Sequence, residues 1–133
     1  LQARNQVAFS ALEELLGWLG NTKGAHVGLF DATNTTRVRR QEIMTRCART
    51  PGIRVAFLES ICTDEGILHK NYDMKLQNAD YCKWDPEEAR KDFQQRVERY
   101  EKEYETVEDD EDEGRVSFMK VLNCGEKTVQ RCC

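Results

Sequence analysis

The residues best suited to chemistry lie in one short segment between Gly28 and Arg40. A hydrophobic run ends there in Asp31, and hydroxyl side chains follow, then Arg37 and Arg39. A carboxylate after a strand can hold Mg²⁺ or its bound water, and arginines bind phosphate through paired hydrogen bonds. This combination is typical of phosphoryl transfer. An Asp that begins a turn, followed by solvated arginines, would give the same pattern, so spacing alone leaves both interpretations open.

The elements around this segment predict an α/β sheet. Residues 25–30 form a short apolar run that is too short for a helix and ends at a carboxylate, as a buried strand would. Residues 34–36 can cap a helix that stops before Pro51, and residues 53–58 suggest a second strand. The order strand, helix, strand predicts a right-handed parallel unit.

Two amphipathic helices are expected outside this unit. Asp85 begins a long helix, because it is a good N-cap followed by Pro86 and by acidic residues in the first turn. Arg96 should lie beside Tyr100 on this helix, one turn away. An N-terminal helix is indicated by apolar residues at one-face spacing: Ala8, Leu12, Leu15, Leu16 and Leu19. A short helix at 64–70 and a strand at 116–121 complete the expected elements.

Composition fits one domain over residues 1–133, with 39% hydrophobic and 33% charged residues. No apolar run approaches the roughly 20 residues of a membrane-spanning helix, and the basic residues are too few for a nucleic-acid footprint. The six cysteines are scattered without a CxxC pair, which favours reduced thiols in the cytoplasm over disulfides. The acidic run 108–113 is interpreted as a solvated loop.

The segment from Phe30 to Arg37, followed by Arg39 and Arg40, resembles the kinase-domain signature of the 6-phosphofructo-2-kinase/fructose-2,6-bisphosphatase family. Further similar segments follow in order at residues 57–62, 78–81, 92–100 and 117–121. An ordered series is more specific than any single motif. The resemblance implies an α/β fold, a partial P-loop-kinase-like parallel sheet with flanking helices. It also implies transfer of the ATP γ-phosphate to the 2-hydroxyl of fructose 6-phosphate.

The resemblance also implies a role for particular residues, which should converge around one sugar phosphate. Asp31 matches an active-site aspartate, as a Mg²⁺-water ligand or polarising base, and Lys75 and Cys62 match further catalytic positions. Asn71 falls in an ATP-contact segment that is one residue shorter here than in the family. The matched contacts to fructose 6-phosphate are Arg4, Thr33, Arg39, Lys75, Arg96 and Tyr100. From periodicity alone, Arg96 and Tyr100 would belong to an ordinary half-buried stripe.

The sequence departs from a complete enzyme in two respects. It contains no Gly-x-x-x-x-Gly-Lys-Ser/Thr loop to cradle the ATP phosphates, so this chain alone is expected to be inactive. Neither His26 nor His69 lies in the Arg-His-Gly motif of the family's phosphatase, which is expected as a fused domain in the full-length protein. Two alternatives stay open: another nucleoside-dependent small-molecule kinase, and a non-catalytic α/β binding module that uses the acidic run.

Overall fold

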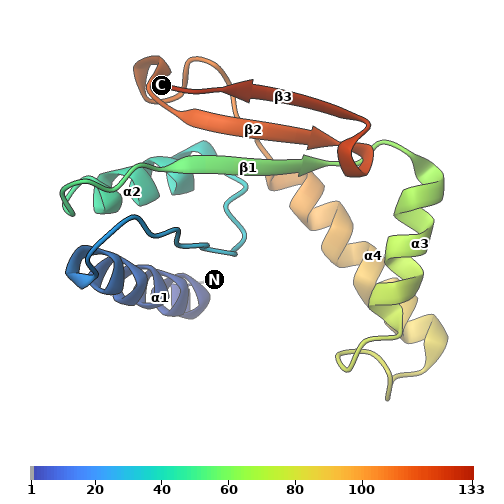
Figure 1. The fold of residues 1–133 in the computed structure, drawn as a ribbon. Helices are drawn as coiled ribbons and strands as arrows, with labels where there is room; N and C mark the ends of the chain where they lie inside the picture. The colour runs from blue at the N-terminus through green and yellow to red at the C-terminus, as the bar shows by residue number, and fades with distance from the viewer. Residues whose placement is uncertain (1) are drawn as a thin grey trace. The chain divides into compact units, whose positions relative to one another are not determined.

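The chain folds as two units, one ending at Val55 and the other comprising Ala56–Cys133 (Figure 1). The computed structural model describes residues 2–133, and their side chains from residue 5 onward. We refer to the two parts as unit 1 and unit 2.

Unit 1 contains the helices α1 (Gln2–Asn21) and α2 (Arg37–Cys47), so both helices expected there are confirmed. Thr36 caps α2, as predicted, by accepting a hydrogen bond from the Arg39 backbone N–H at 3.3 Å. Arg46 of α2 connects the two helices, because its guanidinium lies 2.8 Å from the Glu13 carboxylate and 4.1 Å from the centre of the Phe9 ring. The apolar residues buried in this unit are Phe9, Leu12, Leu16, Ile43 and Cys47.

The strand expected at residues 25–30 does not form, and the parallel unit built on it is therefore wrong. The segment is irregular, and Val27 and Leu29 are 92% and 84% exposed. A strand needs a neighbour to satisfy its backbone N–H and C=O groups, and no described residue pairs with this segment in a sheet. Instead the segment runs close to α1, since a Cβ added at Gly28 would lie 2.9 Å from a Leu19 methyl group.

Unit 2 contains a mixed three-stranded sheet in the order β1-β2-β3. β1 (Ala56–Ile61) is parallel to β2 (Ser117–Leu122), and β2 is antiparallel to β3 (Lys127–Arg131). The strand predicted at 53–58 is confirmed with later bounds, the strand predicted at 116–121 is confirmed, and β3 was not predicted. The expected α/β class is also confirmed.

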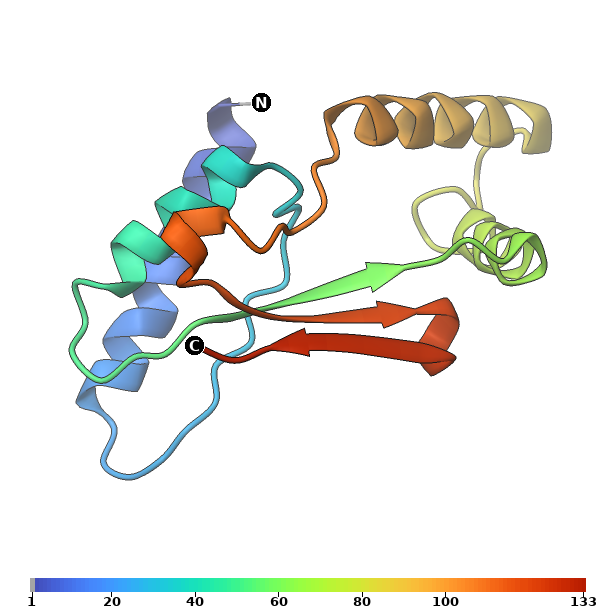
Figure 2. The same ribbon diagram turned by 90° about the horizontal axis from the view of Figure 1, so that it is seen from above.

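Two helices, α3 (Glu65–Leu76) and α4 (Pro86–Glu103), form the crossover from β1 to β2. They lie beyond the carboxyl end of β1 (Figure 2). Asp64 caps α3 by accepting from the Ile67 N–H at 2.9 Å, and α3 runs further than the predicted residue 70. Asp85 caps α4, as predicted, by accepting from two backbone N–H groups at 3.0 and 3.2 Å.

The inner face of the sheet buries a carboxylate, that of Glu59, which is 8% exposed. It accepts hydrogen bonds from the Tyr104 hydroxyl, from Thr106 Oγ1 at 2.7 Å and from the Val107 N–H at 3.3 Å. Lys120 Nζ, from the paired position on β2, lies 3.4 Å away. Burial alone would raise the pKa of Glu59, but these donors together outweigh it and lower the pKa.

A small apolar cluster next to this carboxylate is formed by Val107, Val116 and Phe118 with Phe57 packed against them. Val107 therefore both joins this cluster and binds the Glu59 carboxylate through its backbone N–H. The chain that leaves α4 is thus fixed to the sheet by apolar and by polar contacts.

The interpretation of the acidic run at 108–113 as a solvated loop agrees with the exposure of residues 108, 109, 110 and 113, but it is wrong for Glu111. Glu111 is 3% exposed, and its carboxylate accepts from the Glu108 N–H at 3.2 Å. Asp109 lies 3.3 Å from the Arg131 guanidinium of β3. Internal contacts therefore neutralise part of this charge.

Two sequence-based expectations concern the whole chain. All six cysteines are free thiols in the structure. Within residues 2–133, none of the helices combines the length and apolar character that crossing a membrane requires.

Replacing Glu59 with Gln should lower the free energy of unfolding of the purified chain by about 2 kcal/mol at neutral pH, because a neutral amide binds these donors less strongly. The folded-state pKa lies below the ordinary value of 4.5. The stabilisation is therefore present above that value and is lost as the pH falls through the folded pKa. In urea unfolding, the difference in the free energy of unfolding between wild type and Glu59→Gln should become smaller towards low pH.

Glu101→Gln, at an exposed position on α4, is the control. An equal, pH-independent loss of stability in both variants would contradict this role of Glu59.

Candidate functional site

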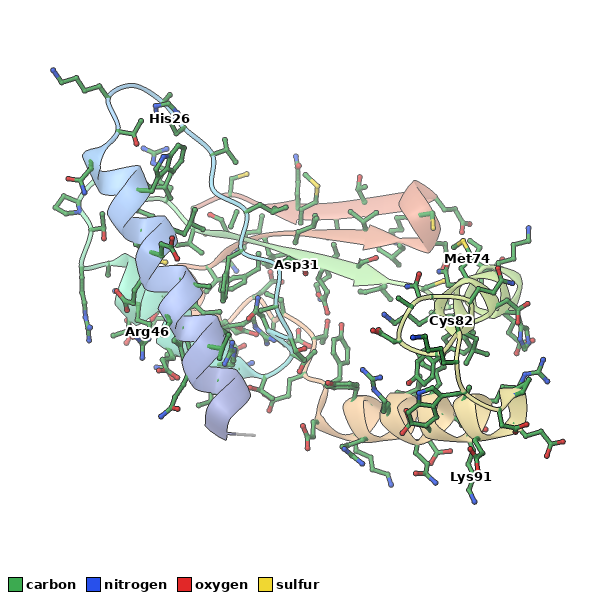
Figure 3. All side chains as sticks on the ribbon, turned by 90° about the horizontal axis from the view of Figure 1, so that it is seen from below. His26, Asp31, Arg46, Met74, Cys82 and Lys91 are labelled. Carbon is green, nitrogen blue, oxygen red and sulfur yellow. The ribbon has the colours of Figure 1, made fainter. Side chains whose placement is uncertain are left out.

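Asp31 and Thr33 lie in the irregular segment between α1 and α2, and both are exposed. Figure 3 labels Asp31 on this segment. The described residues contain no group of three or more His, Cys, Asp or Glu side chains that could hold a metal ion. Mg²⁺, however, is commonly held by one or two carboxylates together with waters and substrate phosphates. A single carboxylate such as that of Asp31 fits the chemistry of such a shared Mg²⁺ site.

Arg39 is held in place by neutral groups. Its Nη1 donates to Asn5 Oδ1 at 2.9 Å and its Nε to Asn34 Oδ1 at 3.4 Å. Its guanidinium also lies 4.4 Å from the centre of the Phe9 ring. No carboxylate of the described residues pairs with it. Its positive charge is therefore oriented without being neutralised.

Arg40 differs from its neighbour Arg39, because its side chain is buried. Arg40 is 2% exposed and donates to the Asn34 carbonyl oxygen at 3.3 Å. A guanidinium buried in this way stabilises the loop before α2 and is not available to a ligand.

Lys75 of α3 and Arg96 of α4 each contact the connection between these two helices. Lys75 Nζ lies 3.3 Å from Asp80, and Arg96 Nη1 donates to the Tyr81 hydroxyl at 2.8 Å. Asp80 and Tyr81 are consecutive, so both cations reach the same short connection between the helices. Tyr100 is 37% exposed and lies one turn from Arg96 on α4. Its exposure argues against a purely core role.

Two other candidates lie apart from this pair. Cys62 precedes α3, and its Sγ donates to the Asp64 carbonyl oxygen at 3.7 Å. Lys75 is in the last turn of the same helix, so the two residues are separated by roughly 15 Å of helix at 1.5 Å per residue. Asn71 is exposed on α3. The side chain of Arg4 lies outside the described residues.

Sequence reasoning missed the residues that hold the candidates in place. Asn34 adjoins Thr33, and Tyr81 lies in one of the family-like segments, so both could have been found by asking what supports a neighbouring candidate. Asn5 carries no such signal. Asn123 also carries none, although its Oδ1 accepts from the Thr63 N–H at 2.8 Å and the Asp64 N–H at 3.2 Å, joining β2 to the start of α3.

Arg46 differs from the two candidate arginines because it is paired with carboxylates. Figure 3 shows Arg46 beside α1, and its guanidinium pairs with Glu13 and Glu42, both at 2.8 Å. Those carboxylates raise the pKa of Arg46 through hydrogen bonds. Arg39 and Arg96, by contrast, contact a neutral amide and a neutral hydroxyl.

The adjacent residues Arg39 and Arg40 offer a matched test of these assignments. Arg40→Gln should lower the free energy of unfolding by about 2–3 kcal/mol, since it removes the hydrogen bonds of a buried guanidinium and leaves their acceptors without a donor. Arg39→Gln, at a partly exposed position, should cost less than half as much. Urea unfolding of the two variants measures both values, and an equal loss at the two positions would refute the distinction.

Comparison with known proteins covers almost the whole chain. The family model described as 6-phosphofructo-2-kinase matches residues 1–132. The chain is 42% identical over 127 residues to 6-phosphofructo-2-kinase 1 of Saccharomyces cerevisiae, which covers 95% of the chain. It is 43% identical to the 6-phosphofructo-2-kinase/fructose-2,6-bisphosphatase of Gallus gallus and 41% identical to the human enzyme numbered 1, each over 126 residues and 94% of the chain.

The chain spans only part of these relatives. It corresponds to 15% of the length of the yeast protein and to 26% of the chicken and human proteins. The similarity thus concerns one region of larger proteins.

Proposed function

Because this chain belongs to the 6-phosphofructo-2-kinase family, we propose that it supplies the sugar-phosphate side of a kinase. The full-length protein transfers the γ-phosphoryl group of ATP to the 2-hydroxyl of fructose 6-phosphate, giving fructose 2,6-bisphosphate. The family match over residues 1–132 is the observation that carries this proposal.

The geometry of the two arginines supports the proposal. Phosphoryl transfer depends on positioned cations that offset the charge of the phosphates. Arg39 and Arg96 are both positioned by neutral partners, so each keeps its positive charge for a ligand. A surface arginine already paired with a carboxylate, such as Arg46, would have to give up that contact before binding phosphate.

Each remaining candidate has a proposed role. Thr33 and Tyr100 offer hydroxyls to the sugar phosphate, with Arg4 as a further cation. Lys75 serves the substrate and the transferring phosphate, and Asn71 contacts ATP. Cys62 stays a candidate for the catalytic centre, although a displacement at phosphorus does not need a thiol.

Asp31 is proposed to hold Mg²⁺ through its carboxylate or to polarise the 2-hydroxyl. Mg²⁺ would neutralise charge on the phosphates. The residues of this chain are not sufficient to bind the triphosphate of ATP, because the sequence contains no glycine-rich phosphate loop. We therefore propose that the chain alone does not catalyse the transfer.

The wider assignment rests on the family. Bifunctional relatives support a fused phosphatase domain in the full-length protein. The product would regulate glycolysis, and the cytoplasm, where thiols stay reduced, is the proposed location. The alternative of a binding module that uses the acidic run gains no support, because Glu111 is buried and Asp112 pairs with Arg115 at 3.3 Å.

Kinetics of the full-length protein test the proposal. We expect ATP-dependent formation of fructose 2,6-bisphosphate from fructose 6-phosphate. Asp31→Asn should lower kcat by about 100-fold or more, as expected for loss of a charge that acts in the transition state. Arg96→Ala should raise the KM for fructose 6-phosphate by about 10-fold to 100-fold.

Arg99→Ala is the matched control, because Arg99 is exposed on the same helix and makes no hydrogen bond or ion pair with a described residue. It should change neither constant by more than about twofold. A wild-type protein that does not phosphorylate fructose 6-phosphate, or equal effects of Arg96→Ala and Arg99→Ala, would overturn the proposal.

A further inference from the structure

The hydroxyl of Tyr81 stands between two opposite charges on α4. It donates its proton to Asp92 Oδ2 at 2.7 Å and accepts a hydrogen bond from Arg96 Nη1 at 2.8 Å. Asp92 and Arg96 are one turn apart, which is the spacing at which an acid and an arginine usually pair directly. Yet they form no direct ion pair in the described part of the chain.

The ring of Tyr81 is fixed, and so is its hydroxyl. The residue is 4% exposed. Its ring meets Trp84 edge-on with ring centres 5.7 Å apart and Phe93 edge-on at 6.1 Å. Burial, and the hydrogen bond to Asp92, raise the pKa of Tyr81. The phenol therefore stays protonated at neutral pH, and its single proton forms the hydrogen bond to Asp92.

This arrangement affects what Arg96 can bind. A guanidinium has five N–H donors, and a carboxylate that paired with it would both occupy donors and neutralise its charge. Tyr81 instead offers Arg96 one neutral acceptor and occupies the nearby carboxylate. The contrast with Lys75 is direct, since that cation pairs with the carboxylate of Asp80 at 3.3 Å.

We propose that Tyr81 is a positioning residue that keeps Asp92 away from Arg96, so that the guanidinium stays available to the anionic substrate. The proposal rests on the proposed function, since it takes the anion to be the phosphate ester that Arg96 binds. Tyr81 does not touch the substrate in this account and acts only through Arg96.

Tyr81→Phe in the full-length protein should allow Asp92 to pair with Arg96. We expect the KM for fructose 6-phosphate to rise about tenfold, with kcat and the KM for ATP within about twofold of wild type. The double variant Tyr81→Phe/Asp92→Asn lacks the competing carboxylate. Its KM for fructose 6-phosphate should therefore be at least about threefold lower than that of Tyr81→Phe, which is the size of effect expected when one ion pair is lost.

Tyr72→Phe is the matched control. Tyr72 also meets Phe93 edge-on, with ring centres 5.2 Å apart, but its hydroxyl makes no hydrogen bond to a described residue. Loss of this hydroxyl should leave the KM unchanged. Thermal unfolding of each variant shows whether the fold is retained.

If Tyr81→Phe does not fold, the Asp92 variants decide, because they leave the buried ring in place. Asp92→Glu lengthens the side chain, so that its carboxylate can reach Arg96. This variant should raise the KM for fructose 6-phosphate more than Asp92→Asn does. A purely structural role for Asp92 predicts the reverse order, because Asn loses the charge-assisted hydrogen bond.

The inference and the function it rests on fail differently. A wild-type protein without fructose 6-phosphate kinase activity overturns both. If the wild type is active, three results would overturn the inference alone. They are a Tyr81→Phe variant with the wild-type KM for fructose 6-phosphate, a double variant with a higher KM than Tyr81→Phe, and an Asp92→Asn variant with a higher KM than Asp92→Glu.

Discussion

The structure of unit 2 depends on one buried carboxylate. Glu59 lies on the inner face of β1, where an unpaired charge would be strongly destabilising. Its partners come from β2, through Lys120, and from the chain just after α4, through Tyr104 and Thr106. Satisfying this one charge therefore fixes where the long crossover returns to the sheet. Because α4 ends at Glu103, the same constraint anchors the helix that carries Arg96 and Tyr100.

The two candidate arginines, Arg39 and Arg96, follow a different rule from the charges that hold the fold, and from the candidate Lys75, which pairs with Asp80. Charges that hold the fold are paired with opposite charges, as Glu59 is with Lys120 and Arg46 is with Glu13. Arg39 and Arg96 are instead held by neutral oxygens. Positioning a guanidinium without neutralising it costs some stability, since no opposite charge compensates its own. That cost is what a phosphate-binding residue is expected to carry.

Much of the fold was predictable because its signals are local. Thr36 and Asp85 mark helix starts within a few residues, and the structure confirms both caps. The strand at 25–30 failed because pairing depends on a neighbour elsewhere, which an apolar run does not report. The supporting contacts were invisible for the same reason: Asn5 is 34 residues from Arg39, and Tyr104 is 45 residues from Glu59. Similarity to a known family, by contrast, pointed to the candidate residues directly.

A crystal structure of the full-length protein with bound fructose 6-phosphate tests the central claim most directly. The account predicts that Arg96 donates to an oxygen of the sugar phosphate at about 2.7–2.9 Å while its Nη1 still donates to the Tyr81 hydroxyl. A substrate bound away from α4, or an Arg96 side chain turned onto Asp92 with substrate present, would contradict it.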